Sequence, residues 1–98
     1  MAVARPYEVT VVVRPDIDDT NFATVVDKVK GWITTAGGSV TQTNVGGRRR
    51  LAYPIKKLTE GQYVWLRATI PAQALAGLER ELRLSEEILR FLIVRVGD

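Results

Sequence analysis

Three consecutive arginines are the residues of this chain best suited to bind a ligand. Arg48, Arg49 and Arg50 follow a pair of glycines and precede a short apolar run at residues 51–55. Each guanidinium group is a permanent cation whose planar set of N–H donors matches the oxygens of a phosphate. The apolar run predicts a strand, which would hold these groups on a rigid frame. A charge run of this kind is also typical of a solvated, solubilising hairpin tip.

Positive charge is concentrated in the middle of the chain. Residues 28–67 contain eight basic residues, including Lys56 and Lys57, and one acidic residue, Glu60. The remainder contains six basic and ten acidic residues, and the net charge of the whole chain is +3. This polarity favours one surface that meets a polyanion. The alternative is that folding scatters these charges over the surface.

The composition excludes several kinds of catalytic site. The 98 residues include no cysteine and no histidine, which excludes disulfides, thiolate metal sites, Ser-His-Asp triads and most zinc sites. No stretch approaches the about 20 apolar residues of a membrane-spanning helix, and residues 1–6 lack the apolar region of a signal peptide. We expect a single domain at residues 1–98, cytoplasmic and not an enzyme, with no cofactor, metal, membrane or small-molecule substrate.

Hydrophobic periodicity predicts alternating strands and helices along the chain. The predicted order is a strand at residues 7–14, a helix ending at glycines 37 and 38, a strand from residue 39 toward 55, a polar connection at residues 56–61, a strand at residues 62–70, a helix opened by Pro71, and a strand at residues 89–96. The acidic residues 16, 18 and 19 predict the start of the first helix, and glycines 46 and 47 predict a bulge or bend in the second strand. Right-handed crossovers then place both helices on one face of a four-stranded antiparallel sheet. The predicted fold class is α+β, a ferredoxin-like β-α-β-β-α-β sandwich with its first and third strands in the centre.

Alternation along the strands predicts which side chains the helices leave uncovered. The more regular aliphatic sets should pack under the helices, and the opposite face then mixes aromatic, aliphatic and arginine side chains. An exposed apolar patch usually marks an interaction surface, and aromatic residues and arginine are enriched at binding hot spots. The alternative for Trp65 is a half-buried residue covered by the strand-two hairpin. The predicted partner-binding residues are Val12, Arg14, Tyr63, Trp65, Arg67, Leu92 and Val94.

The chain resembles the bacterial small-subunit ribosomal protein number six family. The resemblance extends over residues 7–96, and its most specific part is the run at residues 47–55. The other matching positions are Tyr7, Glu8, Gly37, Gly38, Gly61, Tyr63, residues 81–83, Leu89 and Arg90. The resemblance implies a structural protein of the small-subunit platform that binds the central domain of small-subunit ribosomal RNA, jointly with the eighteenth small-subunit protein as a heterodimer.

The resemblance also carries residues over. The basic signature of the family falls on Arg49 and Arg50, with Tyr53 behind them. Phosphate contacts mostly position a protein on folded RNA, whereas shape supplies the selectivity. The predicted RNA-binding residues are Arg48, Arg49, Arg50, Lys56, Lys57 and Arg90.

Three other functions are compatible with parts of the sequence. A protein-interaction module would use the apolar patch and make little RNA contact. An acylphosphatase-like enzyme needs a glycine-rich phosphate loop after its first strand, but residues 15–19 are acidic and lack glycine. The adjacent acids Glu86 and Glu87 are more typical of a surface turn than of acid–base chemistry. A general RNA-recognition domain would stack bases on Tyr63 and Trp65, but the first strand offers no matching aromatic residue.

Overall fold

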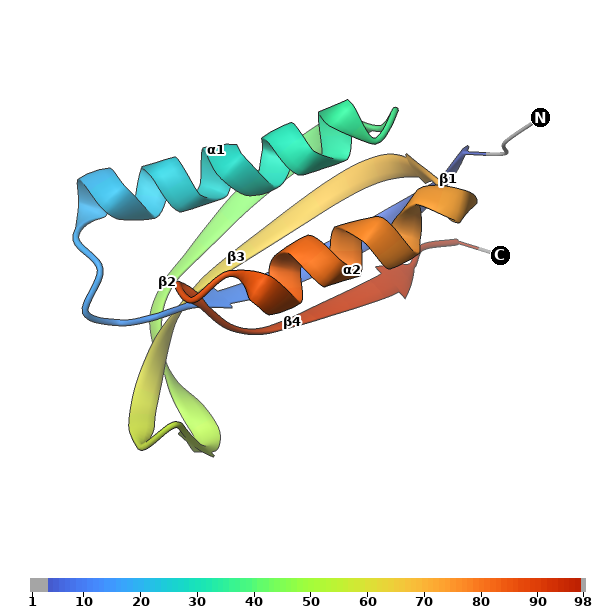
Figure 1. The fold of residues 1–98 in the computed structure, drawn as a ribbon. Helices are drawn as coiled ribbons and strands as arrows, with labels where there is room; N and C mark the ends of the chain where they lie inside the picture. Colours follow the sequence, from blue (N-terminus) through green and yellow to red (C-terminus); the bar gives the residue numbers. More distant parts are fainter. Residues whose placement is uncertain (1–3, 98) are drawn as a thin grey trace.

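The chain forms one four-stranded antiparallel sheet with both helices on one of its faces (Figure 1). The structure is a computed structural model that describes residues 4–97. Its elements are β1 (Ala4–Val13), α1 (Asp19–Thr35), β2 (Ser39–Ile55), β3 (Leu58–Pro71), a 3-10 turn (Ala72–Ala74), α2 (Leu75–Leu84) and β4 (Ile88–Arg95). The strand order is β2-β3-β1-β4, so β1 and β3 are central. The predicted ferredoxin-like fold is confirmed.

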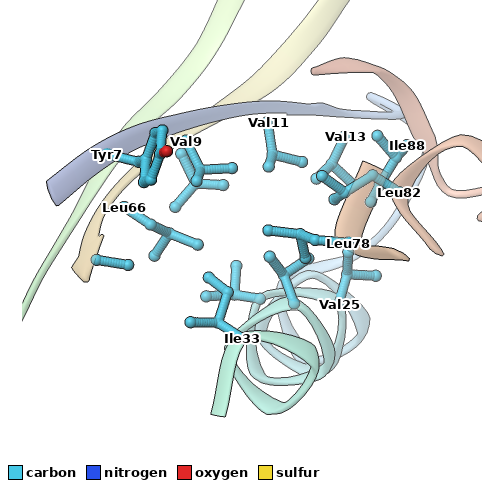
Figure 2. Close-up of a cluster of buried hydrophobic side chains, with 14 of the residues drawn as sticks. Tyr7, Val9, Val11, Val13, Val25, Ile33, Leu66, Leu78, Leu82 and Ile88 are labelled. Atoms are coloured by element: carbon cyan, nitrogen blue, oxygen red, sulfur yellow. The ribbon is translucent and has the colours of Figure 1, made fainter. Parts of the chain in front are cut away.

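The hydrophobic core lies between the sheet and the two helices (Figure 2). Val9, Val11 and Val13 of β1 are completely buried, because alternate residues of a strand point to the same face. Leu66 of β3 and Ile33 of α1 are buried equally well. Each such side chain contributes about 1.5–3 kcal/mol to folding. The face predicted to pack under the helices is therefore the correct one.

Local signals set the ends of α1 as the sequence predicts. The carboxylate of Asp18 caps its first turn by accepting a hydrogen bond of 2.8 Å from the backbone N–H of Asn21. Asp19 adds a negative charge near the positive end of the helix dipole. The helix ends at Thr35, just before the glycine pair. By contrast, Pro71 is the last residue of β3, and the 3-10 turn separates it from α2.

The hairpin formed by β2 and β3 is longer than predicted. Only Lys56 and Lys57 connect its strands, whereas the sequence predicted a polar connection at residues 56–61. Both lysines have positive φ, 51° and 68°, as a two-residue type I′ turn requires. Pairing with β2 draws Glu60 and its neighbours into β3 in spite of their polar composition. In Figure 1 the end of this hairpin projects beyond the two helices.

Candidate nucleic-acid and protein interface

The three arginines lie on the outer part of β2, where the hairpin leaves the body of the protein. Residues 48–60, here called the basic hairpin, include the arginines and the two-lysine turn. All three arginine side chains are exposed. Among residues 4–97, the ion pairs join Arg14 to Asp16, Lys28 to Glu87, and Arg67 to Glu8, so none involves the arginine triplet. No carboxylate of the described residues therefore forms an ion pair with an arginine or lysine of the basic hairpin, although Glu60 is the cross-strand neighbour of Arg50.

The register of the hairpin separates the three arginines. Arg48 is paired with Gln62, Arg49 with Gly61, and Arg50 with Glu60. Paired residues of an antiparallel sheet share a face, and successive residues alternate between faces. Arg48 and Arg50 therefore lie on one face of the hairpin and Arg49 on the other. The face that holds Arg49 is continuous with the open face, meaning the sheet face that the helices do not cover.

Arg49 is held against Trp65 on the open face. Its Nε donates a hydrogen bond of 3.2 Å to the carbonyl oxygen of Gly46. Its guanidinium carbon lies 5.2 Å from the centroid of the Trp65 ring, within the range of a cation–π interaction. Tyr63 lies beside the indole, with ring centroids 5.9 Å apart. The three side chains form a contiguous group, here called the Arg49–Trp65 stack.

Trp65 packs directly on the backbone of β2. A Cβ atom added at Gly46 would overlap Cζ3 of the indole, so only glycine allows this approach. The register of β2 against β3 also shifts between Val45 and Gly47, which confirms the bulge that the glycine pair predicts. Trp65 is half-buried under β2, as the alternative interpretation held, yet it remains on the open face.

Arg90 joins β4 to the basic hairpin. Its Nη1 donates a hydrogen bond of 2.9 Å to the hydroxyl oxygen of Tyr53, and its guanidinium carbon lies 5.7 Å from the centroid of that ring. Tyr53 is otherwise 56% exposed. These contacts connect residues 37 positions apart in sequence. Arg90 is therefore close to the basic hairpin, as an RNA-binding role requires, but part of its donor capacity is already used.

Most of the predicted partner-binding residues meet on the open face. Leu92 and Val94 of β4 are 54% and 47% exposed, which is unusual for large aliphatic side chains. Tyr63 and Trp65 of β3 are half-buried on the same face, and Thr10 and Val12 of β1 lie between them and β4 in the strand register. Arg67 forms an ion pair of 3.6 Å with Glu8 of the neighbouring β1. The result is a partly apolar surface on which Glu8 lies between Arg67 and Val94 in the strand register.

The expected exposure of Val12 is wrong. Its side chain lies on the face opposite the helices but is only 2% exposed. A Cβ added at Gly61 would overlap Cγ1 of Val12 and lie 3.4 Å from Cδ2 of Leu51. Leu51, itself buried, therefore lies over Val12 as the hairpin curls across the end of the sheet. The two side chains form a small second core that a partner does not reach.

The expected place of Arg14 on the open face is also wrong. Arg14 follows the last residue of β1, where the register between β1 and β4 shifts after Val12. It borders a depression together with Lys28 of α1 and Glu86, on the helix side of the molecule. Its Nε donates a hydrogen bond of 3.2 Å to Asp16. The alternation of side chains along β1 ends at Val13, one residue before Arg14, so it does not predict the side of the sheet on which Arg14 lies.

Two carboxyl groups have altered acidity, and both have structural partners. The hydrogen bond from Arg14 lowers the pKa of Asp16. The hydroxyl of Ser85 donates to Glu87 at 2.9 Å and lowers its pKa, with Lys28 contributing by its charge at 3.8 Å. A general acid near neutral pH needs a raised pKa. The direction of the Glu87 shift therefore argues against a role of Glu87 as a general acid.

Comparison with known proteins identifies the family. The sequence model of the family described as ribosomal protein S6 matches residues 6–95. The chain belongs to the ribosomal protein S6 family. The resemblance inferred from residues 47–55 and the flanking positions is therefore confirmed.

Individual members of the family resemble the chain over nearly its whole length. The small ribosomal subunit protein bS6 of Salinispora arenicola is 44% identical over 91 residues, which cover 93% of this chain and 95% of that protein. Its counterpart in Thermosynechococcus vestitus is 37% identical over 92 residues, covering 94% and 81%. The crystal structure of 30S ribosomal protein S6 from Thermotoga maritima matches with a TM-score of 0.90 at 29% identity, covering 96% and 89%.

Sequence reasoning missed the contacts that order the basic hairpin. The pairing of Arg90 with Tyr53 and the burial of Leu51 join segments far apart in sequence, and no local pattern signals them. The glycine pair before the arginines does carry a signal, since glycines inside a strand pattern indicate a bulge. Within residues 4–97, no helix has both the length and the apolar character needed to cross a membrane.

Proposed function

We propose that this chain is a structural constituent of the small ribosomal subunit. In this proposal it acts as a single cytoplasmic domain without catalytic activity, and it binds the central domain of small-subunit ribosomal RNA together with the eighteenth small-subunit protein. Family membership supports the subunit assignment, since the relatives of Salinispora arenicola and Thermosynechococcus vestitus carry the name small ribosomal subunit protein.

One observation carries the RNA-binding part of the proposal. The basic hairpin projects from the body of the protein and presents exposed arginines and two turn lysines that no carboxylate of the described residues pairs (Figure 1). Arginine forks and lysine amines on a rigid ladder suit the phosphates of folded RNA. Arg90 adds a further cation at the base of this surface through its contact with Tyr53.

The open face supports the protein-binding part. Leu92 and Val94 remain about half exposed beside Trp65 and Tyr63, while the other face of the same sheet is sealed by helices. Exposed aliphatic and aromatic side chains in one patch are typical of a protein interface. The residues proposed to contact the eighteenth protein are Tyr63, Trp65, Arg67, Leu92 and Val94.

Salt dependence of RNA binding tests the proposal. The ligand is a transcript of the central domain of small-subunit ribosomal RNA, titrated with the chain and a saturating amount of the eighteenth protein. If about four phosphates are neutralised, log K should fall with log salt at a slope of roughly −3 to −4. The double variant Arg48→Ala and Arg50→Ala should flatten this slope by about 2, because it removes two phosphate contacts.

A matched variant controls for net charge. Lys30→Ala with Arg80→Ala removes the same two charges from the helix layer and should leave the slope unchanged. Binding that does not respond to salt, or that responds equally to both double variants, would contradict the proposal. If the chain binds the eighteenth protein but has no affinity for RNA, alone or with that protein, the alternative function is favoured, a protein-interaction module. The exposed Leu92 and Val94 are the observation that supports this alternative.

A further inference from the structure

The arginine triplet is one motif in the sequence but two groups in space. Arg48 and Arg50 share the face of the hairpin that holds Gln62 and Glu60, their cross-strand neighbours. Arg49 shares the opposite face with Gly61. A one-residue step along a strand reverses the direction of the side chain. The middle arginine is therefore directed to a different surface from its two neighbours.

The contacts of Arg49 differ from those expected of a free phosphate ligand. One of its donors, Nε, is already satisfied by the carbonyl oxygen of Gly46. Its guanidinium carbon lies over the Trp65 ring, 5.2 Å from the ring centroid. Among hydrogen bonds of the described residues, none involves the side chain of Arg48 or Arg50. Arg49 is thus held in one place, while its neighbours stay free to adapt to phosphates.

The surroundings of Arg49 favour a protein over RNA. The Arg49–Trp65 stack lies on the same sheet face as the exposed Leu92 and Val94, and Thr10 of β1 is the cross-strand neighbour of both Trp65 and Leu92. The same face carries the carboxylate of Glu8, which forms an ion pair of 3.6 Å with Arg67. Stacked aromatic residues, a fixed arginine and exposed aliphatic groups are the composition of a protein–protein hot spot.

We propose that Arg49 is a docking residue for the protein partner and that only Arg48 and Arg50 of the triplet contact RNA. This inference rests on the proposed function, and it assigns the partner of one residue within it. A segment of the eighteenth protein packs on the Arg49–Trp65 stack. The Nη atoms of Arg49 donate hydrogen bonds to oxygen atoms of that segment, while Nε remains bonded to Gly46.

Single variants with two readouts test the inference. Affinity for the eighteenth protein is measured by calorimetry without RNA, and the salt slope of RNA binding is measured at saturating eighteenth protein for each variant. Arg49→Ala should weaken protein binding roughly tenfold, as expected of a hot-spot residue, and leave the slope unchanged. Arg50→Ala should leave protein binding within about twofold and flatten the slope by about 0.9.

A conservative variant separates geometry from charge. Arg49→Lys keeps the positive charge but loses the planar stack and the Nε donor, so it should weaken protein binding nearly as much as Arg49→Ala. Its RNA slope should equal that of the wild type. Near-ultraviolet circular dichroism and the melting temperature verify that each variant remains folded, and Trp65 fluorescence reports directly on the stack.

The outcomes distinguish the inference from the function beneath it. If the wild type binds both ligands and Arg49→Ala flattens the salt slope without changing protein affinity, Arg49 is an RNA contact and the inference fails while the proposed function stands. Equal effects of Arg49→Ala and Arg50→Ala on both readouts would also refute it. If the wild-type chain binds neither ligand, the proposed function fails and the inference with it.

Discussion

The two faces of the sheet are formed by the same strands, and they differ in what covers them. On the helix face, Leu66 is completely buried, and so are the alternate valines of β1. On the open face, Leu92 is 54% exposed beside a half-buried tryptophan. No charged side chain is among the buried core residues of the described chain, whereas Glu8 and Arg67 form an ion pair on the open face. The buried side chains that stabilise the fold therefore lie mainly on the helix face, and the exposed side chains available for contacts with a partner lie on the open face.

The largest expected effect comes from shortening the same residue type on each face. Leu66→Ala should destabilise the protein by about 2–5 kcal/mol, because it removes buried methyl groups and leaves a cavity. Leu92→Ala should cost less than about 1 kcal/mol, since its side chain is already half in water. Urea denaturation of both variants measures the difference. Equal losses would mean that the open face is part of the core and would remove the basis of the comparison.

A pair of glycine variants extends the comparison to the backbone. Gly46→Ala should destabilise the protein by about 1–3 kcal/mol and shift Trp65 emission, because the new Cβ overlaps the indole. Gly31→Ala, in the middle of α1, adds a Cβ that would meet no neighbouring group within 4 Å, so it should instead stabilise the protein by about 1 kcal/mol. Thermal melting with fluorescence measures both. A harmless Gly46→Ala would show that Trp65 does not depend on close approach to β2.

The turn of the basic hairpin allows one substitution to change stability and RNA binding in opposite directions. Lys56 and Lys57 both adopt the left-handed conformation, which disfavours residues other than glycine and asparagine. Replacing them with Asn and Gly should raise stability by about 1 kcal/mol, because the turn loses its strain. The same change removes two cations and should weaken RNA binding. A variant that gains stability and binds RNA as tightly as before would show that these lysines do not contact RNA.

The smallest expected effect concerns pH on the helix face. The pKa of Glu87 is lowered from its ordinary value of 4.5, first by the hydrogen bond from Ser85. A carboxylate of this kind stabilises the folded state above the pKa of the unfolded chain, and this contribution is lost as the pH falls through the lower folded pKa. Glu87→Gln should therefore reduce the melting temperature slightly at pH 7 and have no effect well below pH 4. An unchanged melting temperature of Glu87→Gln at pH 7 would contradict this prediction.

Much of the fold could be predicted because it follows from short-range patterns. The alternation of Val9, Val11 and Val13 correctly identified the face under the helices, and the acidic residues before α1 correctly located its start. The prediction failed where alternation ended or where a distant segment intervened. Arg14 lies after the end of β1, and Val12 is covered by Leu51 from the hairpin. Neither the end of β1 before Arg14 nor the position of Leu51 next to Val12 can be recognised from the residues that surround Arg14 or Val12 in the sequence.

The candidate site divides in the same way. Composition and the basic run identified the arginines, the turn lysines and the aromatic residues of β3 as contact residues, and these assignments remain predictions. The hydrogen bond from Arg90 to Tyr53 and the stacking of Arg49 near Trp65 were not predictable. Each depends on how far the hairpin twists and curls relative to the sheet, a property of the packed strands together.

The sequence alone determined the order of strands and helices, the face of the sheet that is buried, and the presence of concentrated positive charge. These properties depend on periods of two and 3.6 residues and on residue type, which are local. Only the tertiary structure decided that Val12 is covered, that Arg90 contacts Tyr53, and that Arg49 is separated from Arg48 and Arg50. The physical reason is that strand register and hairpin curvature are fixed by contacts between residues that are distant in sequence, and these contacts determine which side chains share a surface.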